Sequence, residues 1–89
     1  MSIEILINKE FEKTIDMLYL SKAEIDNPLN YLKLILKRND LLNKYTDEEI
    51  DAINENIIQL KEINLEIKNL LNKIDEIQIE INNEFKKKR

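Results

Sequence analysis

Residues 46–85 read TDEEIDAINENIIQLKEINLEIKNLLNKIDEIQIEINNEF, and one hydrophobic spacing runs through them without interruption. The positions of this pattern alternate by three and four residues, and they are Ile50, Ile53, Ile57, Leu60, Asn64, Ile67, Leu71, Ile74, Gln78, Ile81 and Phe85. Nine of the eleven are apolar, which is the a/d signature of a long helix that lies along a partner. At about 1.5 Å per residue, this helix is expected to be roughly 60 Å long.

The composition favours an all-α protein. The 89 residues include 16 Ile and 13 Leu but no Gly, one Pro and five aromatic residues, so the tight turns and close backbone approaches that a sheet protein needs are expected to be scarce. The abundant Lys, Glu and Asn residues recur at helical spacing between the apolar ones. A chain of this length supports one core, and we expect residues 1–89 to form a single helical domain.

The chain offers few groups for chemistry. It contains no Cys and no His, which removes disulfides, thiol chemistry, the usual general base and the commonest ligands of transition metals. We therefore expect no enzyme activity, no cofactor and no metal site. Glu62 and Glu66 are four residues apart, and we interpret this carboxylate pair as part of a solvated helix face.

Charge and hydropathy restrict the partners. The net charge is −4, and residues 46–89 carry eleven acidic against seven basic side chains, which disfavours nucleic acid as a ligand. No segment resembles a signal peptide, and no apolar run reaches the roughly 18 residues that a membrane span needs, so we expect a cytoplasmic protein without membrane insertion. The basic residues 86–89 are interpreted as a C-terminal helix end that suits the helix dipole.

Two junctions divide the chain into three predicted helices. The residue before a proline avoids the helical conformation, Asn is a strong N-cap, and Pro fits the first helical position, so Asn27-Pro28 is expected to separate two helices. At the second junction, Thr46 and Glu49 have the spacing of a capping box, which predicts a helix start at residue 47. The predicted helices span residues 3–26, 28–44 and 47–87.

The lengths of these helices constrain the architecture, because the second covers less than half of the third. Either the chain reverses at Pro28 and forms an antiparallel three-helix bundle, or the proline only kinks one helix and the chain forms a long helical hairpin. We favour three helices with one antiparallel hairpin and leave the angle at Pro28 open. Gln78 lies beyond the reach of the second helix, and we interpret it as a position where water reaches the surface.

Further apolar residues lie beside the main pattern of the third helix. A second row has seven-residue spacing with Asn72 at its missing step: Ile58, Leu65 and Ile79. Another set widens the main pattern on its other side: Ile63, Leu70 and Ile77. This excess of apolar surface predicts a docking groove for a protein partner, or equally the core of a bundle or a homodimer. The candidate protein-binding residues are Tyr19, Tyr31, Leu34, Ile58, Leu65 and Ile79.

Two stretches of the first half resemble a known family. LYLSK at residues 18–22 and LKLILKRNDLL at residues 32–42 resemble the first two helices of flagellar export chaperones of the FliT type, and residues 57–71 resemble the next helix of that family. The resemblance covers about residues 11–85, although Asn27-Pro28 stands where the family has an acidic-aromatic turn. It implies a small cytosolic helical chaperone that binds the C-terminal part of a late flagellar export substrate, typically the filament-cap protein, and presents it to the type III export machinery.

The residues by themselves leave two other functions open. A homodimeric structural coiled coil would use the same a/d pattern to bind a second copy of the chain. A small regulatory protein would sequester another factor through it. All three functions depend on protein binding rather than on chemistry.

Overall fold

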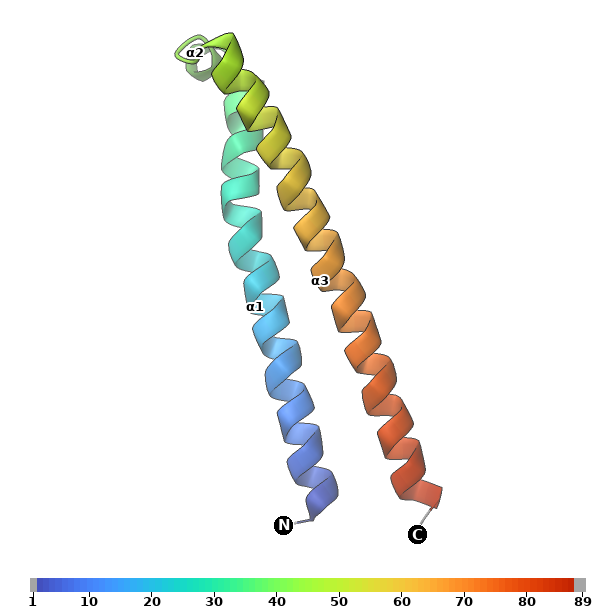
Figure 1. Cartoon of the computed structure of the whole chain (residues 1–89). Coiled ribbons are helices and arrows are strands. Elements are labelled where there is room, and N and C mark those ends of the chain that lie inside the picture. The colour runs from blue at the N-terminus through green and yellow to red at the C-terminus, as the bar shows by residue number, and fades with distance from the viewer. Residues whose placement is uncertain (1, 88–89) are drawn as a thin grey trace.

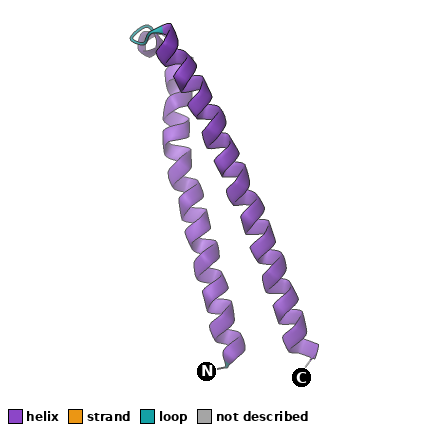
Figure 2. Cartoon of the chain, viewed as in Figure 1, coloured by secondary structure: helices purple, strands orange, loops and turns teal. Residues whose placement is uncertain are grey.

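The computed structural model describes residues 2–87 and shows an all-α protein. Its helices, in chain order, are α1 at Ile3–Lys37, α2 at Asn39–Leu42 and α3 at Asp47–Lys87. The two long helices lie side by side and run in opposite directions, so that the start of α1 and the end of α3 lie at the same end of the molecule (Figure 1). The described residues contain no strand (Figure 2). The molecule is strongly elongated, at 66 × 19 × 15 Å.

The predicted helix break at Pro28 is wrong. α1 runs without interruption through Pro28, so the predicted helix 3–26 and the first part of the predicted helix 28–44 form one helix that ends at Lys37. A third long helix is therefore absent from the described residues, and the bundle with a reversal at Pro28 is not formed. The chain instead has the second predicted arrangement, a long helical hairpin. After Lys37 the chain forms only α2, a single helical turn.

The hydrophobic pattern explains why α1 continues through Pro28. Apolar positions keep their alternating spacing on both sides of it, at Ile25, Leu29, Leu32 and Leu36. A proline inside a helix costs about 3 kcal/mol. Leu29 is buried, which contributes about 2 kcal/mol, and the partly buried Leu32 adds to this by packing against the same core cluster. Pro28 itself is exposed, so packing against α3 offsets the local cost of the proline.

The a/d pattern of α3 is confirmed. All eleven of its positions are buried or half-buried, whereas every other residue of α3 except Asn82 is exposed. A matching pattern on α1 faces it, with a positions Asn8, Ile15, Lys22, Leu29 and Leu36, and d positions Glu4, Phe11, Leu18, Ile25 and Leu32. These ten residues are also buried or half-buried. The partner that covers α3 along its length is therefore α1.

The buried core is concentrated where the two long helices are connected. Leu29 and Ile35 of α1 cluster with Ile53 and Ile57 of α3. Half-buried side chains pack around this cluster, and they are Leu32, Leu36, Leu41, Tyr45 and Leu60. Among residues 2–87 the only other buried hydrophobic residue is Ile67. Packing between α1 and α3 thus loosens toward their free ends.

Local hydrogen bonds define the connection between the long helices. Arg38 leaves the helical conformation at φ −108° and ψ 112°, and its guanidinium donates to the Asp40 carboxylate at 2.6 and 3.1 Å. The predicted capping box is confirmed: the Thr46 amide donates to Glu49 Oε1 at 3.0 Å, and the Glu49 amide donates to Thr46 Oγ1 at 3.1 Å. Two backbone donors at the start of α3 are satisfied in this way.

An amide cluster links the free ends of the long helices. Asn8 Nδ2 donates to Asn82 Oδ1 at 3.0 Å, and Asn82 Nδ2 donates back to Asn8 Oδ1 at 3.0 Å. Gln78 Nε2 donates to the same Asn8 oxygen at 2.9 Å. The interpretation of Gln78 as a position beyond its partner helix is therefore wrong, because α1 extends past it and supplies Asn8.

A second polar link lies halfway along the molecule. Asn64 Nδ2 of α3 donates to Asp26 Oδ1 of α1 at 2.7 Å, and the Lys22 ammonium lies 3.8 Å from the other Asp26 oxygen. We call the Asn8–Asn82 and Asp26–Asn64 pairs the register contacts. Together they fix which residues of α1 lie level with which residues of α3.

Candidate protein-binding surface

The described residues expose more large hydrophobic side chains than they bury. Five hydrophobic residues are buried, whereas fourteen large ones are exposed. All fourteen lie on α1 or α3, and they are Ile3, Ile5, Leu6, Met17, Tyr19, Leu20, Tyr31, Leu34, Ile58, Ile63, Leu65, Leu70, Ile77 and Ile79. Exposed apolar area of this extent marks a binding surface when the residues are contiguous. Their distribution over the faces of the molecule therefore decides where a partner can dock.

The six candidate residues predicted from the sequence are all exposed, with exposed fractions between 43% for Leu34 and 61% for Tyr31. Ile58, Leu65 and Ile79 occupy b positions on the outer flank of α3. Tyr19 of α1 lies near the gap in this row, because it lines a hollow of about 140 Å³ together with Asn72 and other residues of α3. These four residues therefore lie on the same side of the molecule.

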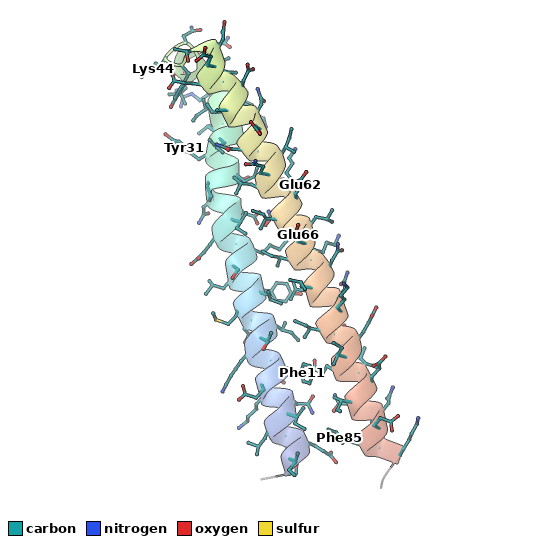
Figure 3. All side chains as sticks on the ribbon, viewed as in Figure 1. Phe11, Tyr31, Lys44, Glu62, Glu66 and Phe85 are labelled. Carbon is teal, nitrogen blue, oxygen red and sulfur yellow. The ribbon has the colours of Figure 1, made fainter. Side chains whose placement is uncertain are left out.

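The remaining two candidates lie elsewhere. Tyr31 and Leu34 occupy neighbouring c and f positions on α1, and Figure 3 shows Tyr31 on the side of α1 that points away from α3. The same outer side carries two more exposed pairs at the same spacing, Ile3 with Leu6 and Met17 with Leu20. Charged residues such as Glu10 and Glu24 separate these pairs, so the outer side of α1 is not one continuous apolar surface.

The a/d pattern defines two faces of the α1–α3 pair. In an antiparallel pair, the g positions of both helices border one face, and the e positions of both border the other. Between residues 7 and 35 of α1 and residues 56 and 77 of α3, the g positions are Ile7, Thr14, Ser21, Pro28, Ile35, Asn56, Ile63, Leu70 and Ile77. None of these nine residues is charged. We call the side of the molecule that they form the uncharged face.

Charged g positions occur only at the two ends of α3, outside the uncharged face. Glu49 belongs to the capping box at the start of the helix. Glu84 lies in the last turn, where its carboxylate contacts the Lys87 ammonium at 3.2 Å. Both acidic side chains therefore lie outside the length of α3 that forms the uncharged face.

The other face, by contrast, is mostly charged. Its e positions are Ile5, Glu12, Tyr19, Asp26 and Lys33 on α1, and Asn54, Lys61, Lys68, Asp75 and Asn82 on α3. Six of these ten side chains are charged, and both register contacts use residues from this set. A partner helix that covered this face would have to desolvate these charges, which is costly unless each is paired.

The polar groups of the α1 side of the uncharged face are already satisfied within α1. The Thr14 hydroxyl donates to the Glu10 carbonyl at 3.1 Å, and the Ser21 hydroxyl donates to the Met17 carbonyl at 2.9 Å. Pro28 has no backbone N–H to satisfy. Covering these residues with a partner therefore removes no hydrogen bond that the side-chain donors need from water.

The uncharged face is hollowed near the free ends of the helices. A depression of about 270 Å³ is lined by Ile7, Glu10, Phe11 and Thr14 of α1 and by Ile74 of α3. Phe11 and Phe85 lie between the two helices in this half of the molecule (Figure 3). At the other end Ile35 is already buried, in the cluster against which Leu41 and Tyr45 pack. The open part of the face therefore runs from Ile7 to Pro28.

Sequence patterning identifies only part of this surface. Ile63, Leu70 and Ile77 widen the main pattern of α3, but the six candidate residues do not include them. The α1 side of the face is missed because Thr14 and Ser21 are polar, because Pro28 is interpreted as a helix break, and because the polar a and d positions of α1 hide its register. The signal that is present in the sequence is the unbroken apolar spacing from Ile25 through Leu36.

Other kinds of site receive no support from the described residues. No group of three or more acidic side chains in residues 2–87 is arranged to hold a metal ion. None of the helices of residues 2–87 combines the length and the apolar character that crossing a membrane requires. In the basic cluster at the end of α3, Lys87 pairs with Glu84, while Lys88 and Arg89 lie outside the described residues.

Comparisons of the chain with protein-family models, with curated proteins and with solved structures find no match.

Proposed function

We propose that this protein is a helical binding module that holds an amphipathic helical segment of another protein along its uncharged face. The observation that carries the proposal is the combination of an uncharged row on α1 with exposed Ile63, Leu70 and Ile77 on α3. An amphipathic helix that docks in such a position presents apolar side chains at intervals of three, four and seven residues. Such a helix would bury Ile63, Leu70 and Ile77, which the contact between α1 and α3 leaves exposed.

The proposal differs in one respect from the candidate residues derived from the sequence. Ile58 and Leu65 lie on the flank next to the charged face, so a helix docked on them would meet Lys61 or Lys68 on one side. The uncharged face requires no such pairing. Either surface would bind a helix under the general proposal. Substitutions on each flank of α3 distinguish between the two docking sites.

A titration with a defined peptide tests the general function. We would use a fluorescein-labelled 21-residue peptide with Leu and Ile on one helical face and uncharged polar residues elsewhere, together with a scrambled peptide of the same composition. The expected result is saturable binding of the amphipathic peptide in a 1:1 complex, with at least about tenfold weaker binding of the scrambled one. A chain that forms a stable dimer by light scattering and binds neither peptide would instead be a structural coiled coil.

The resemblance to flagellar export chaperones gives the proposal a more specific form, in which the bound helix belongs to the C-terminal part of a filament-cap protein and the protein acts in the cytosol. LYLSK at residues 18–22 lies on α1, while residues 32–42 span the end of α1 and α2. The test replaces the designed peptide by the C-terminal segment of a filament-cap protein. Binding no tighter than that of its scrambled version would reject the flagellar form while leaving general helix binding intact.

A further inference from the structure

The two borders of the uncharged face carry acidic side chains. The c positions lie next to the g positions on each helix. Alongside the uncharged face they are Ile3, Glu10, Met17, Glu24 and Tyr31 on α1, and Gln59, Glu66, Lys73 and Glu80 on α3. All nine residues are exposed. Four are carboxylates and one is an ammonium, so each border carries two acidic side chains and Lys73 is the single basic side chain among the nine.

The carboxylates of the two borders lie at matching levels. The register contacts place Glu10 level with Glu80, and Glu24 level with Glu66. The two levels are separated by fourteen residues along each helix, which corresponds to about 21 Å. A helix that lay in the uncharged face would therefore have an acidic side chain on both of its sides at each of two levels.

Internal pairing does not neutralise these carboxylates effectively. Glu10 contacts the Lys13 ammonium at 3.1 Å, but the two side chains are 73% and 71% exposed. Exposed ion pairs of this kind contribute little free energy, so Glu10 can exchange this contact for one with a partner. Lys73 lies level with Met17 of α1, between the two acidic levels, and so leaves both of them acidic.

A second copy of this chain is a poor occupant of the face. Each copy carries a net charge of −4. Packing two uncharged faces together would bring the acidic borders of one copy against the acidic borders of the other. Like-charge juxtaposition of this kind disfavours an interface, whereas opposite charge favours it and speeds encounter.

We infer that the occupant of the uncharged face is one helix of a different protein, with an apolar stripe toward the face and Lys or Arg side chains on both flanks at two levels about fourteen residues apart. This inference rests on the proposed function and adds the charge pattern of the partner. The open part of the face, from Ile7 to Pro28, is about 32 Å long. It accommodates roughly six turns of such a helix.

Three labelled peptides test the inference. They share the apolar stripe of the 21-residue peptide and differ only at the four flanking positions, which carry Lys, Gln or Glu. Fluorescence anisotropy with the full chain gives the dissociation constants. We expect the Lys peptide to bind about tenfold tighter than the Gln peptide and the Glu peptide to bind weakest. The advantage of the Lys peptide is expected to shrink as salt is raised.

A pair of double variants locates the charges. Glu24→Gln with Glu66→Gln removes one acidic level, and binding of the Lys peptide is expected to weaken about threefold, as for two exposed ion pairs. Glu55→Gln with Glu62→Gln removes the same charge from f positions on the outer side of α3, and these are also exposed. This control is expected to change binding by less than about twofold. Circular dichroism checks that both variants keep the helical content of the parent chain.

The possible results separate the inference from the proposed function. If the Gln peptide binds as tightly as the Lys peptide, or if both double variants weaken binding equally, the inferred charge pattern is wrong and general helix binding stands. If none of the three peptides binds, the proposed function fails as well. A dimer that persists by light scattering and excludes the peptides would show that a second copy occupies the face, which also overturns the inference.

Discussion

Single amides set the register between the two long helices. Asn8 accepts hydrogen bonds from both Gln78 and Asn82 and donates one to Asn82, all across the α1–α3 contact. Polar residues at a positions of coiled coils fix register and strand number at a cost in stability. The cluster therefore holds the free ends of the helices in one register, where buried apolar contacts are few.

The first prediction concerns the substitution of Asn8, the residue at the centre of this cluster. Asn8→Ala deletes three side-chain hydrogen bonds between the helices, and we expect the free energy of unfolding to fall by about 1–2 kcal/mol. Urea denaturation followed by circular dichroism measures the change. Asn69→Ala is the matched control, because Asn69 is exposed at an f position on α3. Equal stability of the two variants would contradict a structural role for the cluster.

The second prediction concerns the start of α3. Thr46→Ala removes the hydroxyl that accepts a hydrogen bond from the Glu49 amide. Loss of such an N-cap lowers the free energy of unfolding by about 1 kcal/mol. Thr14→Ala is the control, since Thr14 lies in the middle of α1 and its hydroxyl bonds only to a carbonyl of its own helix. Thermal unfolding is expected to show a lower midpoint for Thr46→Ala alone. A parallel loss in both variants would argue against the capping box as the cause.

At the scale of helices, the sequence predicts α3 from start to end but leaves the course of α1 at Pro28 open. The eleven a/d positions and the capping box of α3 are unambiguous in the sequence because apolar side chains occupy nearly all of the pattern. In α1 the pattern is interrupted by Glu4, Asn8 and Lys22, and the environment of Asn8 depends on residues of α3 that are distant in sequence. Local rules for Pro28 predict a break, whereas tertiary packing of its apolar neighbours keeps the helix continuous.

The third prediction concerns the continuity of α1. A proline in the interior of a helix is about 3 kcal/mol less favourable than alanine. Pro28→Ala is therefore expected to raise the free energy of unfolding by about 1–3 kcal/mol, since Pro28 is exposed and its replacement leaves the core intact. Ser21→Ala, at the preceding g position, is expected to change stability by less than about 0.5 kcal/mol. Urea denaturation compares the two variants, and destabilisation by Pro28→Ala would show that the proline is required where it stands.

At the scale of the whole molecule, the buried core lies at one end of an elongated shape and the open part of the uncharged face extends to the other. The cluster around Ile35 and Ile57 holds the connected end together, whereas the free ends depend on half-buried side chains and amide contacts. Regions with few buried apolar contacts open most readily. A partner helix that covered the open part of the uncharged face would add apolar packing near the free ends of α1 and α3.

The binding surface shows the limit of prediction from sequence in this protein. The sequence of α3 alone predicts more apolar residues than the core needs. It does not predict which flank of α3 is available for a partner. That depends on which residues of α1 lie beside each flank, and they are Thr14, Ser21 and Pro28 on one side and Glu12, Asp26 and Lys33 on the other. Only the register of α1 against α3 decides that question.

The comparison of two leucines on α3 tests the central claim most directly. Leu70 lies on the uncharged face and Leu65 on the opposite flank, and their exposed fractions are similar at 47% and 58%. We expect Leu70→Glu to weaken binding of the Lys-flanked peptide by at least about tenfold, because it places a carboxylate under the apolar stripe of the bound helix. Leu65→Glu should leave the affinity within about twofold of the parent chain. Loss of binding in Leu65→Glu with none in Leu70→Glu would contradict the claim and place the docking site on the other flank.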